Sequence, residues 1–471
     1  MSDTDVLVIG AGISGLSVAR RLASKGIPVE VWDSEMRPGG LIGSRAQDGY
    51  LTERAAAMVL NFRPEVNQFI AESGLTDAKR TRADTSHRYL VHDARLKKLP
   101  MKLGPMLCSG IWTARGIGRM LLEPLVPRGG SENETVSEFI TRRLGREVLD
   151  KTMGPYVAGI LASDPDRANA RTVLPRLVAL ERRYGSIAMG AFVHRVLRRK
   201  TGTETEGFSF HNGMATLVKS LALGKGVCFR GGHSATDLSR SGHGWQIVAR
   251  TSAGERTVNA RQVVLSVPAS AAAVLLGRHN AELAQLIGDI VYAPMAVVHT
   301  GFDQRAITHP MDGNGFLTQS DHGTSLNGCM WMSSLFDNIA PRGKALLSNY
   351  LGGALHPASV TWSDERLIGE TMQTLRPLLG IRGEPEFIHI DRHQQGLPLY
   401  HGDYYRRMQR LDNLLTELPG VHIQANYRGG ISVRDRLVCA MHAAEQIVRD
   451  LQPSSATTYS LPSLILEPQR G

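Results

Sequence analysis

Apolar residues near the start of the chain follow the pattern of a strand, a helix and a second strand. Residues 6–9 are continuously apolar, as expected for a strand buried on both faces of a parallel sheet. Apolar positions then recur at helical spacing over residues 16–25, and Gly26 and Pro28 end the predicted helix. Residues 29–32 form the second apolar run. The pattern predicts the opening unit of an α/β fold with a parallel sheet.

Short apolar runs of the same kind return in the middle and near the end of the chain. They cover residues 226–229, 263–268 and 420–426, and the last run precedes a helix predicted from Ser432 onward. Strands that belong together are therefore separated by long insertions. This arrangement predicts one discontinuous α/β domain.

The two long insertions differ in their patterns. Apolar residues at helical spacing dominate 95–200, where Ser131 and Glu134 fit a capping box before a helix. The later insertion contains strand-like runs at 296–302 and 348–353. We therefore predict a helical insertion and a β-rich region that walls a substrate cavity.

Composition indicates a globular protein and argues against two kinds of site. The 471 residues exceed one ordinary core, so we expect two or three packed units. The four cysteines form no CxxC pair and the histidines lack metal-type spacing, which argues against a disulfide framework and a metal site. No basic leader precedes Val6, and no apolar run reaches about 18 residues. We predict a cytoplasmic protein without a signal peptide or a spanning helix.

The net charge of +10 indicates either a solvated basic surface or an anionic partner. No nucleic-acid-binding module or compact basic run is present, so we expect no nucleic acid. An acidic substrate or an anionic lipid surface fits better. Residues 99–125 mix apolar and basic side chains, which predicts either peripheral contact with the inner face of a membrane or a core helix pair with a basic face.

A glycine-rich turn joins the first strand to the first helix. Gly10, Gly12 and Gly15 follow the pattern of a dinucleotide site, where glycines permit a tight turn, backbone approach to a pyrophosphate, and close helix–strand packing. The helix N-terminus then faces the phosphate charge. Asp33 ends the second strand, where a carboxylate accepts hydrogen bonds from ribose hydroxyls.

A second glycine turn directly after Asp33 favours FAD over NAD. Arg37, Gly39, Gly40 and Ser44 resemble the R-x-G-G-x-x-x-S element of glutathione-reductase-like and amine-oxidase-like flavoproteins. None of the cysteines sits in a recognisable flavin-attachment motif, so we expect FAD without a covalent link. The predicted FAD-binding residues are Gly10, Gly12, Ile13, Ser14, Gly15, Asp33, Ser34, Arg37, Gly39, Gly40, Leu41, Ala235, Asn426, Gly430, Ile431 and Val433.

The predicted fold class is therefore α/β, with a Rossmann-like FAD-binding domain of the glutathione-reductase and amine-oxidase type, an α+β substrate domain and a helical insertion. The predicted boundaries are 1–84, 204–270 and 392–450 for the FAD-binding domain, 85–203 for the helical insertion, 271–391 for the substrate-binding domain and 451–471 for a flexible tail.

A series of short segments, each weak alone, extends over nearly the whole chain. They are residues 87–91 (HRYLV), 96–100 (LKKLP), 135–139 (TVSEF), 142–145 (RRLG), 155–165 (PYVAGILASDP), 181–186 (ERRYGS), 212–217 (NGMATL), 333–336 (SSLF) and 426–433 (NYRGGISV). In their sequence and order these segments resemble the protoporphyrinogen oxidase family of heme-synthesis flavoproteins.

The resemblance implies that a flavin takes hydride equivalents from a porphyrinogen and passes electrons to oxygen or another acceptor. Arg88 matches the arginine that faces a propionate of the macrocycle, and a guanidinium suits a carboxylate. Backbone donors of residues 429–433 would serve the flavin and its phosphates. The family also implies a membrane-contacting helical insertion, and we expect a homodimer. No catalytic side chain is assigned, because the reaction centres on the flavin.

One departure bears on the substrate. The family usually has E-x-G-P-N-S beside the flavin, whereas Glu53 and Arg54 are followed here by Ala55, Ala56, Ala57 and Met58. The cavity floor is therefore expected to differ in shape and polarity. Two alternatives stay open: a divergent flavin oxidase or desaturase acting on an amine, a polyene or another pyrrole, and a non-catalytic FAD-dependent tetrapyrrole carrier.

Overall fold

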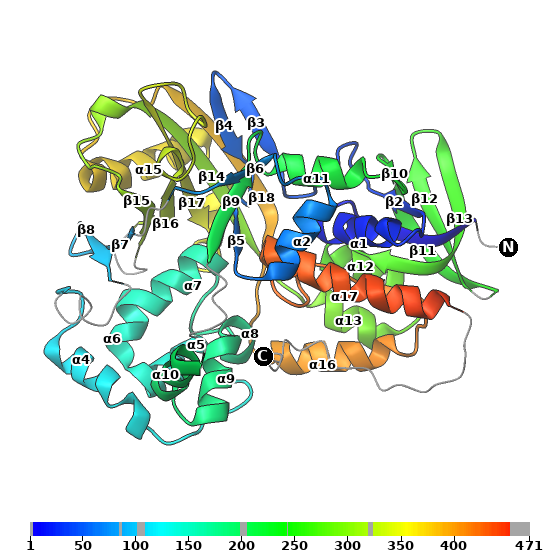
Figure 1. The fold of residues 1–471 in the computed structure, drawn as a ribbon, viewed down its shortest axis with the longest axis horizontal. Helices are drawn as coiled ribbons and strands as arrows, with labels where there is room; N and C mark the ends of the chain where they lie inside the picture. Colours follow the sequence, from blue (N-terminus) through cyan, green and yellow to red (C-terminus); the bar gives the residue numbers. More distant parts are fainter. Residues whose placement is uncertain are drawn as a thin grey trace.

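The computed structural model describes residues 3–83, 87–100, 109–197, 205–242, 244–318 and 324–452, and for 195–197 the backbone alone. Figure 1 shows three parts: a layered α/β region on the right, a second large sheet at the upper left, and a group of helices at the lower left.

The first sheet has seven strands in the order β10-β2-β1-β13-β12-β11, with β19 paired to β13. The pairs among β10, β2, β1, β13 and β19 are parallel, and β11, β12 and β13 form an antiparallel meander. The strands are β1 (Thr4–Ile9), β2 (Val29–Trp32), β10 (Val227–Arg230), β11 (Ser234–Ser241), β12 (Gly244–Thr251), β13 (Gly254–Leu265) and β19 (Val421–Ile423).

Helices cover both faces of this sheet because alternate residues of β1 face opposite ways. Val6 and Val8 belong to one core cluster, and Leu7 and Ile9 to the other. One face carries α1 (Ile13–Ser24), α2 (Pro64–Glu72), α11 (Ala215–Ala222) and α17 (Val433–Leu451), and the other α12 (Ala269–Leu276), α13 (Ala281–Gly288) and α16 (Tyr404–Leu415). These three layers confirm the predicted Rossmann-like α/β class.

The second large sheet has the order β18-β14-β17-β16-β15-β7-β8. Helix α15 (Asp364–Leu379) packs on one face through Leu367 and Leu375, against a core that includes Val298 and Leu347. The strands are β7 (His87–His92), β8 (Arg95–Leu99), β14 (Tyr292–Asp303), β15 (Gly313–Leu317), β16 (Leu326–Trp331), β17 (Lys344–Gly352) and β18 (Phe387–Pro398). The α+β character predicted for the substrate region is therefore confirmed.

The helical region has its own core around Phe139 and Ile140. Its capping box is formed by Thr135 and Glu138, so the prediction of Ser131 and Glu134 is wrong by four residues. Its elements are α4 (Ala114–Leu121), η1 (Glu123–Leu125), α5 (Val136–Leu144), α6 (Arg146–Val148), the π-helical turn η2 (Leu149–Met153), α7 (Gly154–Leu161), α8 (Ala170–Val173), α9 (Pro175–Tyr184) and α10 (Ile187–Leu197).

Short strands join these parts. The hairpin β3 (Ser44–Gln47) and β4 (Tyr50–Glu53) leads from the second glycine turn toward the substrate sheet. A three-stranded sheet in the order β5-β9-β6 brings residues near 60, 80 and 208 together. Its strands are β5 (Val59–Asn61), β6 (Lys79–Thr81) and β9 (Glu206–Phe210).

Several strands cross the domain boundaries drawn from sequence. Residues 87–99, placed in the predicted insertion, form β7 and β8 of the substrate sheet. Strand β18 runs across the boundary at 391 and pairs throughout with β14, while α12 and α13 pack on the nucleotide sheet. Most of the predicted tail, residues 453–471, lies outside the described residues. Among the described helices, none has the length and apolar character needed to cross a bilayer.

Candidate functional site

The first glycine turn brings β1, α1 and β13 together at the carboxyl end of the parallel strands. Gly10 has a φ of 105°, and a Cβ there would overlap the carbonyl oxygen of Ser266. A Cβ at Gly15 would overlap the carbonyl oxygen of Gly10, so neither position accepts a side chain. No described atom lies within 4 Å of the Cβ position of Gly12. The space over Gly12 is open for a phosphate-bearing ligand.

Helix α1 directs its N-terminus toward the same space. Its N-cap is Gly12, which has no capping side chain, and its first turn contains no acidic residue. Ser14 is buried beside Ile13, whose carbonyl accepts a 2.6 Å hydrogen bond from Ser17 Oγ. No side chain therefore competes for the first amides of the helix, which attract anions.

Asp33 directly follows β2, at the edge of this space. Its Oδ2 accepts the N–H of Ala11 at 2.7 Å and its Oδ1 accepts the N–H of Glu35 at 2.8 Å. Burial raises the pKa of Asp33, and these two backbone hydrogen bonds oppose the rise. Each carboxylate oxygen keeps acceptor capacity for a ribose hydroxyl. Ser34 follows and is exposed.

The second glycine turn lies directly against the first. Gly39 donates its N–H to the carbonyl of Ala11 at 2.7 Å and forms a parallel bridge with Gly12. Arg37 donates from Nη2 to the carbonyl of Gly40 at 2.8 Å, so its guanidinium stabilises the turn that it begins. Leu41 is half-buried in the same turn. Residues 10–15 and 33–41 thus surround one space.

The other residues predicted to bind the cofactor come from β11 and from the start of α17. Ala235 is half-buried beside the bulge of β11. The carbonyl of Asn426 accepts the Tyr400 hydroxyl at 2.7 Å. Gly430 has a φ of 101°, and Ser432 caps α17 by accepting the N–H of Asp435 at 3.1 Å. Ile431 is half-buried and Val433 is buried in this N-terminal turn.

The alanine-rich segment 53–58 is anchored at its first residue. Glu53 accepts the Ser44 hydroxyl at 2.7 Å and the N–H of Met214 at 2.9 Å. Burial raises the pKa of Glu53 to about 8, although both hydrogen bonds lower it. Glu53 therefore ties the second glycine turn to the NGM motif at 212–214.

The residues that follow Glu53 turn toward the substrate sheet. Ala55 is half-buried. Ala56 packs against the nucleotide core, whereas Ala57 and Met58 pack with Met330 of β16 in a cluster on the substrate sheet. The segment therefore lies between the two domains.

The face of the substrate sheet opposite α15 can be followed through the strand register. One row pairs Leu90, Leu317, Gly328, Tyr350, Val297 and Asp391 across six strands. Cβ atoms of directly paired residues point to the same side of a sheet. Gly159 of α7 contacts Leu317 and the carbonyl of Asn327, while Met58 and Met330 pack against the same apolar cluster. The helical region and the alanine segment therefore cover two parts of this face.

Arg88 lies on β7, half-buried, two residues before Leu90. Its neighbour Tyr89 packs into the core under α15, so strand alternation puts Arg88 on the opposite face, with Leu90. Among the described residues, its guanidinium has no hydrogen-bond or ion-pair partner. It remains available to an anionic ligand group.

A buried polar cluster on the same face was not among the sequence-predicted site residues. Asp391 accepts from Arg54 Nε at 3.3 Å, and its Oδ2 lies 3.3 Å from His389 Nε2 and 3.8 Å from His299 Nε2. Burial lowers the pKa of His299 to about 4, with Asp391 opposing the shift, so the imidazole is neutral near pH 7. In the sequence, a histidine (His299) inside the apolar run 296–302 could have indicated this cluster.

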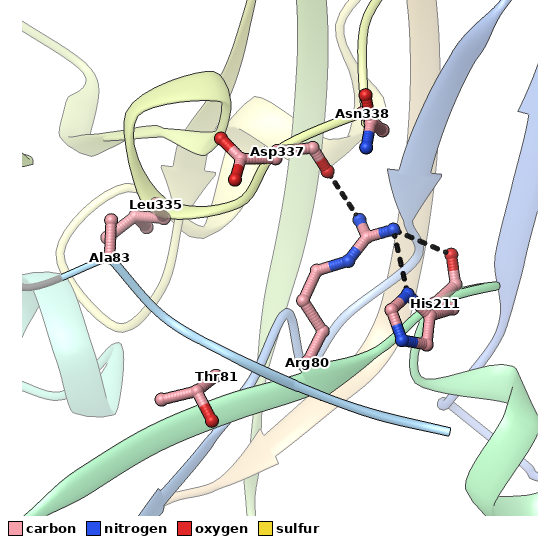
Figure 2. A pocket seen from close by; sticks show the side chains of 7 residues that line it. All are labelled: Arg80, Thr81, Ala83, His211, Leu335, Asp337 and Asn338. Atoms are coloured by element: carbon pink, nitrogen blue, oxygen red, sulfur yellow. Dashed lines mark hydrogen bonds between the residues drawn. The ribbon is translucent and has the colours of Figure 1, made fainter. Parts of the chain in front are cut away.

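A cavity of about 220 Å³ opens where the three-stranded sheet β5-β9-β6 meets the loop after α14 (Met332–Leu335) (Figure 2). The Arg80 side chain bridges these two parts: it donates to the carbonyl of Asp337 at 2.6 Å and to that of His211 at 3.3 Å. Because the guanidinium already donates to these two carbonyls, we interpret Arg80 as a structural contact between domains. None of the predicted site residues lines this cavity.

The arrangement fits a flavin dinucleotide. The open space over Gly12, the uncapped helix start and the Asp33 carboxylate suit a pyrophosphate and a ribose. The buried Ser266 Oγ, beside Gly15, has no hydrogen-bond partner among the described residues.

The comparisons with known proteins agree with this geometry. The model of the flavin containing amine oxidoreductase family matches residues 13–436. Among curated proteins, protoporphyrinogen oxidase 2 of Arabidopsis thaliana is 27% identical and is aligned over 97% of this chain and 96% of its own length. Coproporphyrinogen III oxidase of Bacillus subtilis is 26% identical over 91% of this chain and 95% of its length.

Solved structures show the same fold. A candidate protoporphyrinogen oxidase of Exiguobacterium sp. 255-15 superposes with a TM-score of 0.79 at 23% identity, covering 95% of this chain and 99% of that one. Putrescine oxidase bound to putrescine gives a TM-score of 0.66 at 16% identity, with 95% and 99% covered.

Proposed function

The chain belongs to the flavin-containing amine oxidoreductase family and is an FAD-dependent oxidoreductase, and from this premise we propose that it oxidises a porphyrinogen of heme synthesis to the porphyrin. The substrate would be protoporphyrinogen IX or coproporphyrinogen III, since relatives named for each are similar over nearly the whole chain. The carrying observation is this full-length similarity, which includes the substrate sheet and the helical region as well as the nucleotide domain.

The residues around the site have separable roles in this proposal. The two glycine turns, Asp33 and the start of α17 would hold FAD without a covalent bond, and the flavin would supply hydride acceptance. Arg88 would orient the macrocycle by pairing with a propionate. The apolar side chains of Leu90, Leu317 and Met330 would exclude water from the reacting carbon.

The deciding experiment is anaerobic mixing of the purified yellow protein with protoporphyrinogen IX and, separately, coproporphyrinogen III. Flavin bleaching together with porphyrin fluorescence is expected, and the faster substrate identifies the physiological step. Re-admitting oxygen tests the acceptor, because the flavin spectrum should return. A flavin that stays oxidised with both porphyrinogens contradicts the proposal and directs attention to amines, polyenes or other pyrroles.

Arg88 gives a second test of the same proposal. Replacing Arg88 with alanine removes a charge-assisted contact of about 1.5–3 kcal/mol, so KM should rise roughly 10- to 100-fold while kcat changes little. Arg95→Ala is the control, since Arg95 is an exposed cation on the paired strand β8. Equal effects of the two substitutions would exclude a specific role for Arg88.

We also propose that the helical region contacts an anionic membrane from the cytoplasmic side. Leu121, Leu122 and Leu125 are 66%, 56% and 77% exposed, and η1 packs against α10, which exposes Met189 and Phe192. The exposed Arg115 lies at the start of α4, the helix that ends at Leu121. Apolar side chains beside basic ones suit an interfacial contact with anionic lipid.

A homodimer remains a further expectation, to be tested by the mass of the FAD-bound protein in solution.

A further inference from the structure

The alanine segment depends on neighbouring residues for polar contacts, because its own side chains offer only apolar packing. Ala55, Ala56 and Ala57 have no polar side-chain atoms, and Met58 has only a thioether. Fixed positions beside a ligand require a supporting set of contacts from neighbouring residues. Support for this segment therefore comes from Glu53 and Arg54, which precede it.

Arg54 is held from three directions. Its N–H donates to the carbonyl of Gly43 at 2.8 Å, and its carbonyl lies 2.7 Å from Nε2 of His393 on β18. Its guanidinium pairs with Asp391, also on β18. At Gly43 a Cβ would meet both Arg54 Cδ and Arg37 Nη1, so the Arg54 side chain also packs against the second glycine turn. Arg54 thus connects the nucleotide domain to the substrate sheet.

Asp391 is the centre of the polar cluster on that sheet. Its side chain is 12% exposed, against 34% for Arg54, so it is the more deeply buried member of the pair. His299 is fully buried, lies parallel to His389 at 6.1 Å between ring centres, and uses Nδ1 on Ser348 Oγ at 2.9 Å. Arg54 and Asp391 form a charge pair of zero net charge.

We propose that Arg54 and Asp391 are positioning residues that hold the alanine segment against the flavin and balance each other's charge beside it. The inference deepens the proposed function and rests on it, because it takes the flavin ring to lie over residues 55–58. A single charge in a largely buried place acts over several ångströms with little screening. Removing one member of the pair should therefore change the electrostatic potential at the ring.

The two single substitutions should move the flavin reduction potential in opposite directions. Asp391→Asn leaves the Arg54 cation unbalanced, which stabilises the more negative reduced flavin and raises the potential. Arg54→Met leaves the Asp391 anion and lowers it. We expect roughly a tenfold change in the equilibrium constant of two-electron reduction each way, or about 30 mV. The double variant should return toward the parent value.

The experiment measures that potential by reductive titration against reference dyes, together with release of FAD on dilution. Both single variants should release FAD about tenfold more readily, since the segment loses an anchor. Asp303→Asn is the matched control, because Asp303 lies on the same sheet and pairs with Lys344, not with Arg54. Arg54→Lys keeps the charge and should keep the potential close to the parent.

The outcomes separate this inference from the proposed function. Protein that purifies without FAD refutes both. A flavoprotein whose potential is unchanged, or shifts the same way in both variants, overturns the inference alone. If Asp391→Asn does not fold, Arg54→Met alone carries the test, and an unchanged potential in it is decisive against the inference.

Discussion

At the residue scale, the first glycine turn separates internal packing from ligand space. Gly15→Ala would force a methyl group into the carbonyl of Gly10, so we expect a loss of roughly 1–3 kcal/mol in stability or no folded protein. Gly12→Ala meets no described atom within 4 Å, so its melting temperature without FAD should match the parent. Its FAD affinity should fall at least about tenfold, because the methyl group occupies the phosphate space.

The measurements are thermal unfolding of the FAD-free proteins and titration of FAD by fluorescence. Gly74→Ala serves as a control, since Gly74 has a φ of 70° and an empty Cβ position far along the chain. It should lose stability through backbone strain and keep its FAD affinity. Unaltered FAD affinity in Gly12→Ala would place the pyrophosphate elsewhere.

Glu53 predicts a pH dependence of stability in the FAD-free protein. Its pKa is raised from 4.5 to about 8 by burial, so the folded state holds its proton more tightly than the unfolded state does. The stability associated with that proton is fully present below about pH 4.5 and is lost as pH rises through about 8. For this one proton the free energy of unfolding falls by at most about 1.4 kcal/mol per pH unit.

Chemical denaturation at several pH values between 4.5 and 8 checks this prediction. Glu53→Gln has no proton to lose, so its free energy of unfolding should depend less on pH over that range. A parallel pH dependence in the parent and in Glu53→Gln would mean that the carboxyl is ionised throughout.

The residues that sequence could identify are those whose role is local. Gly15 is required by the nearby carbonyl of Gly10, Gly10 by its own φ of 105°, and Asp33 follows its strand directly. Arg54 and Asp391 could not be paired, because their contact depends on how β4 and β18 meet in the folded chain. Spacing along the sequence carries no information on such a contact.

At the scale of elements, the start of α5 shows how one motif can fit two positions. Ser131 with Glu134 and Thr135 with Glu138 both match the capping-box pattern. In the structure Glu134 forms an ion pair with Arg142 at 2.7 Å, and Val136 donates its N–H to the carbonyl of Ala168. Tertiary contacts therefore select the second box, and local pattern alone could not.

The helical region depends on a buried ion pair that crosses its elements. Glu123 and Arg143 are both fully buried, and Glu123 also accepts the N–H groups of Ile187 and Ala188 at 2.9 and 3.1 Å. Glu123→Gln removes the nearer of the two carboxylates around Arg143 and leaves only Glu181, at 3.5 Å, so the protein should lose up to roughly 3–5 kcal/mol of stability. Glu282→Gln, in the exposed pair with Arg410, should change stability little.

The same carboxyl has a defined pH response. Burial raises the pKa of Glu123, but its hydrogen bonds from Ser186, Ile187, Ala188 and Arg143 outweigh burial and leave the pKa below its usual 4.5. Its contribution is therefore present above about pH 4.5 and is lost as pH falls below that value. Urea denaturation at pH 7 and pH 4, compared with Glu123→Gln, checks this. The destabilisation caused by the substitution should be smaller at pH 4, and an equal loss at both pH values would contradict it.

At the scale of the whole molecule, the order of parts was more predictable than their borders. The return of short parallel strands predicted the nucleotide sheet, because each run is apolar on both faces. Strands β7 and β8 were assigned to the helical insertion. Lys97 and Lys98 obscure the alternation of β8, and β7, its partner, joins the substrate sheet through β15, far along the chain. Borders of discontinuous domains depend on such long-range pairing, which a single sequence does not reveal.

The exposed leucines lie in the helical region, at the lower left of Figure 1, away from the nucleotide domain on the right. If this region docks on lipid, Leu121→Ser with Leu125→Ser should reduce co-sedimentation with anionic vesicles several-fold, because each exposed apolar side chain adds to interfacial burial. Leu223→Ser is the matched control: it is 85% exposed at the end of α11, in the nucleotide domain, and should leave binding unchanged. Neutral vesicles or high salt should weaken binding by the parent, because the basic residues contribute through screened charge. Equal binding of the double variant and the parent would assign the attraction to the net charge of +10 alone, and the helical region would then have no special role in membrane contact.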